Sequence, residues 1–200
     1  MDGDAAPGRL VLIQELANSF DVRRGRDDLA GPRDAAGWLR ARGLLGPQLA
    51  VTAEDLARLH GLREVLRRMC LANNGAELHA ADIDALNVLV RDSDMRPAFT
   101  VHGVGLDILS SGAVGALGQI VGIVYEAIRD GTWGRVKACP EDACNYAFYD
   151  TSRNGSRVWC SMAACGSKVK MRAYRARAKA DLNMGKTSVD RHRSGAQSTQ

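Results

Sequence analysis

The chain has 200 residues, 46% of them hydrophobic and 25% charged, with a formal net charge of +4, a composition that suits one globular domain or a domain with a small added module. The amino terminus, residues 1–4, is acidic where a secretory signal is positive, and no apolar run is long enough to span a bilayer. We therefore expect a soluble, cytoplasmic protein without a membrane partner, whose cysteines serve metal binding or catalysis rather than disulfides.

Apolar residues spaced by three and four predict helices through most of residues 1–130. The clearest begins at Thr52, three residues before Asp55 in a variant of the capping box, and runs to a stop at Asn73-Asn74-Gly75. The other expected helices cover residues 10–20, 34–42, 81–90 and 113–128. In the last two, the sides expected to be buried carry Ile83, Leu86, Asn87 and Val90, and Leu117, Ile120, Val121, Val124 and Ile128.

Two β-favouring stretches interrupt this helical pattern. Residues 99–101 and 105–109 flank Gly103 and predict a small hairpin. The fold class expected is therefore mainly α: a helical domain with a small β-hairpin over residues 1–130, followed by a zinc-binding hairpin-and-helix module over residues 131–182. Residues 183–200 are polar and nearly free of apolar side chains, so we expect a disordered tail.

Four of the five cysteines fall in one short window, as two close pairs. Each pair can form a tight loop that delivers two thiolates, and a hairpin between the pairs can bring them together, as a tetrahedral zinc site requires. Asn154-Gly155, flanked by aromatic and β-branched residues, predicts that hairpin. The alternatives are buried thiols or disulfides. The segment has too few aliphatic residues to form a stable core without a cross-link or a bound metal ion, which favours one structural Zn²⁺ per chain. Its ligands would be Cys139, Cys144, Cys160 and Cys165.

The fifth cysteine, Cys70, lies on the helix that begins at Thr52, and we expect it to be a buried structural thiol.

A basic helix is predicted after the last of these cysteines. Residues 1–130 hold 14 Lys and Arg against 18 Asp and Glu, a net charge of −4, whereas residues 131–200 hold 13 against 5, a net charge of +8. Lys168, Arg172, Arg175 and Lys179 recur at helical spacing, so they line one face. A solvated cationic face is the plainer alternative. The scarcity of acids, together with Lys170, Arg153 and Arg157, favours contact with nucleic acid.

The motif around the second cysteine pair resembles a known family. Residues 160–170, preceded by Asp150-x-Ser152-Arg153-Asn154-Gly155-Ser156-Arg157-x-Trp159, look like the CGNR-type zinc finger of bacterial stress-induced transcription regulators, in which the finger follows a helical ABATE domain. The resemblance spans about residues 10–180 and implies the zinc ligands given above and a DNA-binding role. The family has Asn-Arg after the Cys-Gly of its motif, whereas this chain has Ser167-Lys168. Lysine keeps the positive charge at position 168 but cannot form the two parallel hydrogen bonds that an arginine guanidinium can form.

Sparse landmarks of the helical domain also agree with that family. Among them are Asn18, Arg63 and Asn87, polar residues beside apolar helix faces. They can converge on a pocket for a small-molecule effector, or they can hydrogen-bond to buried backbone groups. The second alternative is the more common one for such residues.

The function predicted is a zinc-finger, DNA-binding transcription regulator whose helical domain senses an effector or forms a homodimer. The rivals are an RNA-binding protein, in which Tyr146, Phe148 and Tyr149 stack on bases, and a zinc-stapled protein-interaction adaptor. We expect no enzyme, because the sequence contains no nucleophile-plus-base arrangement and no phosphate-cradling glycine loop.

Overall fold

The computed structural model describes residues 5–101, 103–177 and 179 and has the mainly helical architecture that the sequence predicts. Contacts divide the chain into two compact units, with the division between Cys160 and Ser161. The boundaries expected at residues 130 and 182 stay predictions. The expected tail, residues 183–200, lies outside the described residues.

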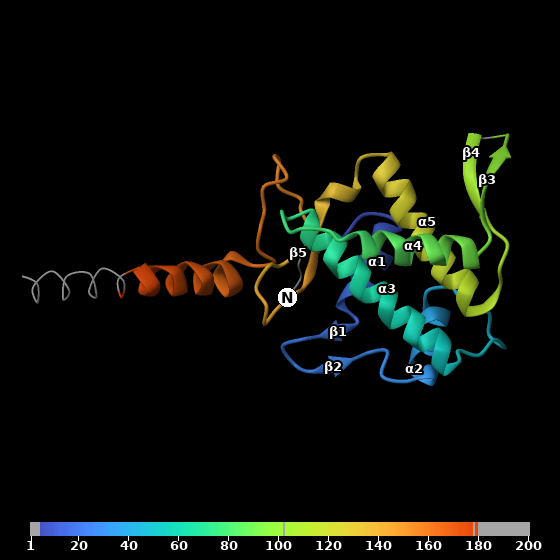
Figure 1. The fold of residues 1–200 in the computed structure, drawn as a ribbon, viewed down its shortest axis with the longest axis horizontal. Helices are drawn as coiled ribbons and strands as arrows, with labels where there is room; N and C mark the ends of the chain where they lie inside the picture. The colour runs from blue at the N-terminus through green and yellow to red at the C-terminus, as the bar shows by residue number, and fades with distance from the viewer. Residues whose placement is uncertain (1–4, 102, 178, 180–200) are drawn as a thin grey trace, which may run out of the picture. The chain divides into compact units, whose positions relative to one another are not determined.

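The first unit is built on four helices that pack side by side, each against at least two of the others (Figure 1). They are α1 (Leu10–Asn18), α3 (Ala53–Ala72), α4 (Ala80–Asp92) and α5 (Gly112–Arg129), and the shorter α2 (Pro32–Ala41) packs on α3. The predicted capping box of α3 is confirmed: the Thr52 hydroxyl accepts from the Asp55 amide at 3.1 Å, and the Asp55 carboxylate accepts from the Thr52 amide at 2.9 Å. Cys70 is buried in this core, as expected.

The buried sides of α4 and α5 differ in part from the prediction. On α4, Leu89 is buried, whereas Ile83 is 41% exposed and Asn87 is exposed. On α5, four of the predicted residues are buried, but Ile128 at the end of the helix is 54% exposed. The reason is that α4 packs on α3 and α5 through its Asp82 and Leu89 edge. A helical repeat shows that a helix has an apolar side but not which edge its neighbours cover.

The glycines inside α5 permit a close approach of the chain. A Cβ atom added to Gly118 would lie 2.5 Å from the Cβ of Ser93, at the end of α4. One added to Gly115 would lie 2.2 Å from the carbonyl oxygen of Ser110. The cost of glycine in a helix interior is therefore offset by packing that alanine would prevent.

In the part of the chain that the structure describes, strands occur as three separate two-stranded antiparallel pairs. The predicted hairpin around Gly103 is confirmed as β3 (Met95–Thr100) and β4 (Gly103–Ile108), which stands clear of the helices at its turn (Figure 1). A short pair, β1 (Phe20–Asp21) and β2 (Arg26–Asp27), follows α1. The third pair, β5 (Val136–Ala138) and β6 (Ala147–Tyr149), follows the short η1 helix (Trp133–Arg135).

The position of the third pair corrects the prediction for the finger. The hairpin does not turn at Asn154-Gly155; it turns between β5 and β6, around the first cysteine pair. Residues 152–155 instead form a turn in which Gly155 has φ +60°, and no strand follows it among the residues described up to 179. The Asn-Gly signal therefore located a turn correctly but not the strands beside it.

The second unit begins with a five-residue π-helix, η2 (Met162–Gly166), and continues as an α-helix over residues 167–177. We call residues 167–177 the basic helix. It starts directly after the last cysteine, as the sequence predicts.

Candidate zinc centre

The four predicted ligands converge on one point. The sulfur atoms of Cys139, Cys144, Cys160 and Cys165 all lie within 4.8 Å of one another, and all four residues are buried. None forms a disulfide. Ligand sulfurs around a tetrahedral zinc are roughly 3.8 Å apart, given a Zn–S distance of about 2.3 Å, and the Sγ atoms of Cys144 and Cys160 are 3.5 Å apart.

The first pair is positioned by the β5–β6 hairpin. The Cys139 amide donates to the Tyr146 carbonyl at 3.0 Å, and the Cys144 amide donates to the Glu141 carbonyl at 2.7 Å. Asn145 takes a left-handed conformation, φ +49°, which asparagine tolerates better than most residues. The hairpin thus closes a tight loop that carries both thiols of the first pair.

The second pair flanks Ser161: Cys160 is the last residue of the first unit, and Cys165 lies in η2. Ser161 caps η2: its hydroxyl accepts from the Ala164 amide at 3.2 Å, and its carbonyl accepts from the Cys165 amide at 2.9 Å. A serine at this place satisfies amides at the start of η2 that would otherwise lack a partner.

The chemistry of the donor set fits a metal ion. A hydrogen bond with Cys144, together with burial, raises the pKa of the Cys139 thiol far above its usual range. Sulfurs this close cannot all carry negative charge unless a cation compensates. Zn²⁺ supplies that charge and accepts four thiolates, which leaves no coordination position for a reacting water. The cluster is therefore a structural zinc-finger site for one Zn²⁺.

A buried ion pair shapes the loop between the two cysteine pairs. Lys137 Nζ lies 2.8 Å from the Asp150 carboxylate, and both side chains are buried. Asp150 also accepts from the Ser152 and Arg157 amides, each at 2.9 Å. Burial opposes ionisation of Asp150, but the hydrogen bonds from Lys137 and Ser152 outweigh it and lower its pKa to about 2. The loop is wrapped around this carboxylate.

Two predicted nucleic-acid contacts lie in this loop. Arg157 donates to the Trp159 carbonyl at 3.0 Å and to the Cys160 carbonyl, and its guanidinium stacks 4.8 Å from the Phe148 ring. Arg153 is exposed. Arg157 thus has a structural use that the sequence did not reveal, and contact of either arginine with nucleic acid stays a prediction.

The remaining predicted contacts are all exposed. They are Lys168, Lys170, Arg172, Arg175 and Lys179. Two apolar residues of the basic helix, Met171 and Tyr174, are 51% and 62% exposed.

Asn18 has a structural role at the boundary between the helices and the finger. Its amide nitrogen donates to the Ala147 carbonyl, and its amide oxygen accepts from the Ala147 amide, both at 2.8 Å. It also lines a pocket of about 190 Å³. The other lining residues are Phe20, Asp21, Arg23, Arg24, Cys144 and Tyr146. Arg63 and Asn87 are not among them, so the three pocket candidates are not brought together there.

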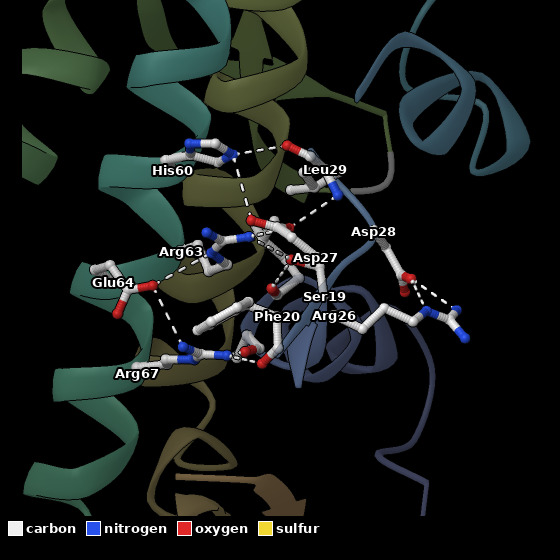
Figure 2. Close-up of polar contacts among 12 residues, drawn as sticks. Ser19, Phe20, Arg26, Asp27, Asp28, Leu29, His60, Arg63, Glu64 and Arg67 are labelled. Atoms are coloured by element: carbon white, nitrogen blue, oxygen red, sulfur yellow. Dashed lines mark hydrogen bonds and ion pairs between the residues drawn. The ribbon is translucent and has the colours of Figure 1, made fainter. Parts of the chain in front are cut away.

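Arg63 belongs to a buried charge network on α3 (Figure 2). Its guanidinium donates to Asp27 at 2.7 Å and to the Ser19 hydroxyl at 3.3 Å, and it packs over Phe20. Arg67, one turn along α3, donates to the Ala17 carbonyl at 2.7 Å. Arg63 thus links Ser19 and Asp27 of β2 to α3, and Arg67 links the end of α1 to it, as a structural role for Arg63 requires.

Sequence reasoning missed Arg23, in the turn between β1 and β2. Its guanidinium donates to the Sγ of Cys144 and lies 3.5 Å from the Sγ of Cys160. No spacing in the sequence relates a turn arginine to cysteines more than a hundred residues away. The same holds for Asn73 and Asn74, which were expected only to end a helix: their amides donate to the carbonyls of Trp133, Val136, Ala138 and Val158.

Comparison with protein families agrees with this architecture. Residues 10–130 match the ABATE model, whose description is "Putative stress-induced transcription regulator", and residues 135–178 match the CGNR zinc finger. No curated protein matches the chain. Within the described residues, no helix combines the length and apolar character needed to cross a membrane.

Proposed function

Because the chain belongs to the ABATE family and carries a CGNR zinc finger, we propose that it is a transcription regulator that binds duplex DNA through its basic helix. Zinc would hold the start of that helix, since Cys165 lies just before it. Both matched families are of regulator and zinc-finger type, which fits a binding protein rather than an enzyme.

The observation that carries this proposal is an exposed row of cations on one face of the basic helix and, at residue 179, just beyond its end. At 100° per residue, Lys168, Arg172, Arg175 and Lys179 fall within an arc of roughly 60°, and all four are exposed. Residues 151–179 contain no Asp or Glu. We call these four residues the cation row. A helix with this charge suits the phosphate-lined major groove, which admits an α-helix.

The predicted contacts outside the cation row have weaker support. Lys170, a predicted contact, lies on the opposite face of the helix together with Arg177, for which no contact is predicted, roughly 160° to 180° from Lys168 at the same angular step. Neither can face the same phosphates as Lys168. They provide matched controls, because they carry the same charge on the same helix.

Duplex DNA is favoured over single-stranded RNA by the three aromatic residues named for the RNA-binding alternative, Tyr146, Phe148 and Tyr149. Stacking on unpaired bases needs accessible rings. Phe148 is fully buried beneath the Arg157 guanidinium, and Tyr146 and Tyr149 are only partly accessible. Tyr149 also packs against the hydrophobic core.

A competition experiment tests the proposal. Full-length, zinc-loaded protein is bound to a labelled mixed-sequence duplex at near-physiological salt, and unlabelled duplex or single-stranded RNA of equal length is added. We expect the duplex to compete at least tenfold better. Stronger competition by RNA would identify an RNA-binding protein, and no binding to either would favour a protein-interaction adaptor.

Lys168 sharpens the test, since it stands where the family has arginine. Arginine can grip a guanine edge or a phosphate with two hydrogen bonds. If Lys168→Arg raises affinity only for certain duplex sequences, position 168 reads bases; if it raises affinity uniformly, position 168 contacts phosphate. Unchanged duplex affinity in both Lys168→Arg and Lys168→Ala would show that Lys168 does not contact DNA.

A further inference from the structure

Arg23 links the helical region to the metal centre of the finger. It lies in the β1–β2 turn, within the part matched by the ABATE model, yet it contacts two of the four zinc-ligating cysteines. Cys144 belongs to the first cysteine pair and Cys160 to the second. One guanidinium therefore bridges both cysteine pairs.

The turn that carries Arg23 is held in a fixed shape. The Asp21 carboxylate accepts from the backbone amides of Arg23 at 2.9 Å and Arg24 at 3.2 Å, and the Arg24 amide also donates to the Asp21 carbonyl. Gly25 completes the turn with φ +61°, a conformation that favours glycine. Arg23 thus reaches the sulfurs from a constrained backbone, which reduces the entropy lost in making these bonds.

The charge of the site calls for such a partner. Four thiolates around Zn²⁺ leave a net charge of −2 in a buried place, and N–H groups that donate to ligand sulfurs disperse it. Outer-shell hydrogen bonds of this kind typically change metal affinity by about 10- to 100-fold. We propose that Arg23 is a positioning residue of the zinc centre, which retains the metal by neutralising and orienting Cys144 and Cys160.

The consequence is that the metal centre includes a residue from outside the finger motif. The pocket that Asn18 lines also contains Arg23 and Cys144, so the guanidinium is shared by the pocket and the centre. The finger motif taken alone would bind zinc more weakly than the whole chain does.

Chelator competition on full-length protein tests the proposal. Arg23→Gln removes the charge, Arg23→Lys keeps the charge but replaces the planar, pre-organised guanidinium by an ammonium on a flexible stem, and Arg24→Gln is the matched control in the same turn. We expect the apparent Kd for zinc to rise about tenfold in Arg23→Gln, to rise less in Arg23→Lys, and to stay within twofold in Arg24→Gln.

Cobalt substitution supplies a second readout that a merely structural role would not change. The sulfur-to-cobalt charge-transfer band should move to longer wavelength in Arg23→Gln, because thiolates without the hydrogen bonds hold their electrons less tightly, and should not move in Arg24→Gln. Equal Kd and equal band position in Arg23→Gln and Arg24→Gln would overturn the proposal. If Arg23→Gln does not fold, Arg23→Lys decides: a Kd and a band equal to those of the unaltered chain would also overturn it.

Discussion

The two parts of the finger, residues 131–160 and 161–177, use their basic side chains in different ways, except that Arg153 of the first part is exposed. In the first part, Arg135, Lys137 and Arg157 all donate to backbone carbonyls of the loop over residues 150–160. In the second part, every lysine and arginine is exposed. A count of positive charges does not distinguish these cases, so charge alone does not mark a nucleic-acid surface.

The first part of the finger is also continuous with the helical fold. Asn18 on α1, and Asn73 and Asn74 at the end of α3, hydrogen-bond to backbone groups of residues 133–158. These bonds cross the boundary predicted at residue 130. The comparison leads to a division of roles in which residues 131–160 are structural and residues 161–177 contain the binding face.

The largest expected effect comes from removing a zinc ligand. Cys165→Ser should abolish stoichiometric zinc binding, since structural zinc contributes an apparent free energy on the order of 10 kcal/mol. Metal analysis should fall from about one zinc per chain to a small fraction. Circular dichroism should retain most helical signal, because the core of α1 to α5 does not use the metal. Full zinc occupancy in this variant would contradict the assigned ligand set.

A smaller loss is expected from breaking the buried ion pair. Asp150→Asn leaves Lys137 without its counter-charge, and breaking a buried pair in this way costs about 3–5 kcal/mol. Urea unfolding followed by circular dichroism measures it. The exposed Asp130→Asn is the control and should leave the midpoint nearly unchanged. Equal urea midpoints for the two variants would contradict a stabilising role of the Lys137–Asp150 ion pair in residues 131–160.

Acid should weaken the same interaction. The pKa of Asp150 is lowered to about 2, against about 3.9 for an unfolded aspartate. A lowered pKa gives stability that is fully present above the unfolded value and is lost as the pH falls from about 4 towards 2. We expect the unfolding free energy to fall over this range and to fall less steeply in Asp150→Asn. Identical pH profiles would show that Asp150 is not preferentially ionised in the fold.

The two asparagines proposed from the sequence as pocket residues should behave differently. Asn18→Ala removes the side-chain partner of the buried Ala147 amide and leaves the Ala147 carbonyl only the longer bond from Gln14, at a cost of about 1–3 kcal/mol. Exposed Asn87→Ala should change the unfolding free energy by less than about 0.5 kcal/mol. Thermal unfolding of both variants measures the difference. Equal changes in the two variants would contradict the role of Asn18 in joining α1 to β6.

Features coded by neighbouring residues could be predicted from the sequence. The Thr52 capping box, the helices, the Gly103 hairpin and the cysteine ligand set all follow from short-range spacing. The features that were missed depend on chain segments far apart in sequence. The Asn-Gly turn lacks its predicted strands because loop amides donate to the Asp150 carboxylate instead of to a partner strand. The exposure of Ile83 depends on which edge of α4 the neighbouring helices cover. Arg23 had no local signal.

The salt dependence of duplex binding tests the division of roles most directly. The double variant Arg172→Gln/Arg175→Gln alters the cation row, and Lys170→Gln/Arg177→Gln removes the same charge from the opposite face of the helix. Each lost phosphate contact flattens the slope of log affinity against log salt by about 0.9. The account predicts a change of nearly two units in the first variant and little change in the second. Equal slopes in the two variants would contradict a DNA-binding face made by the cation row.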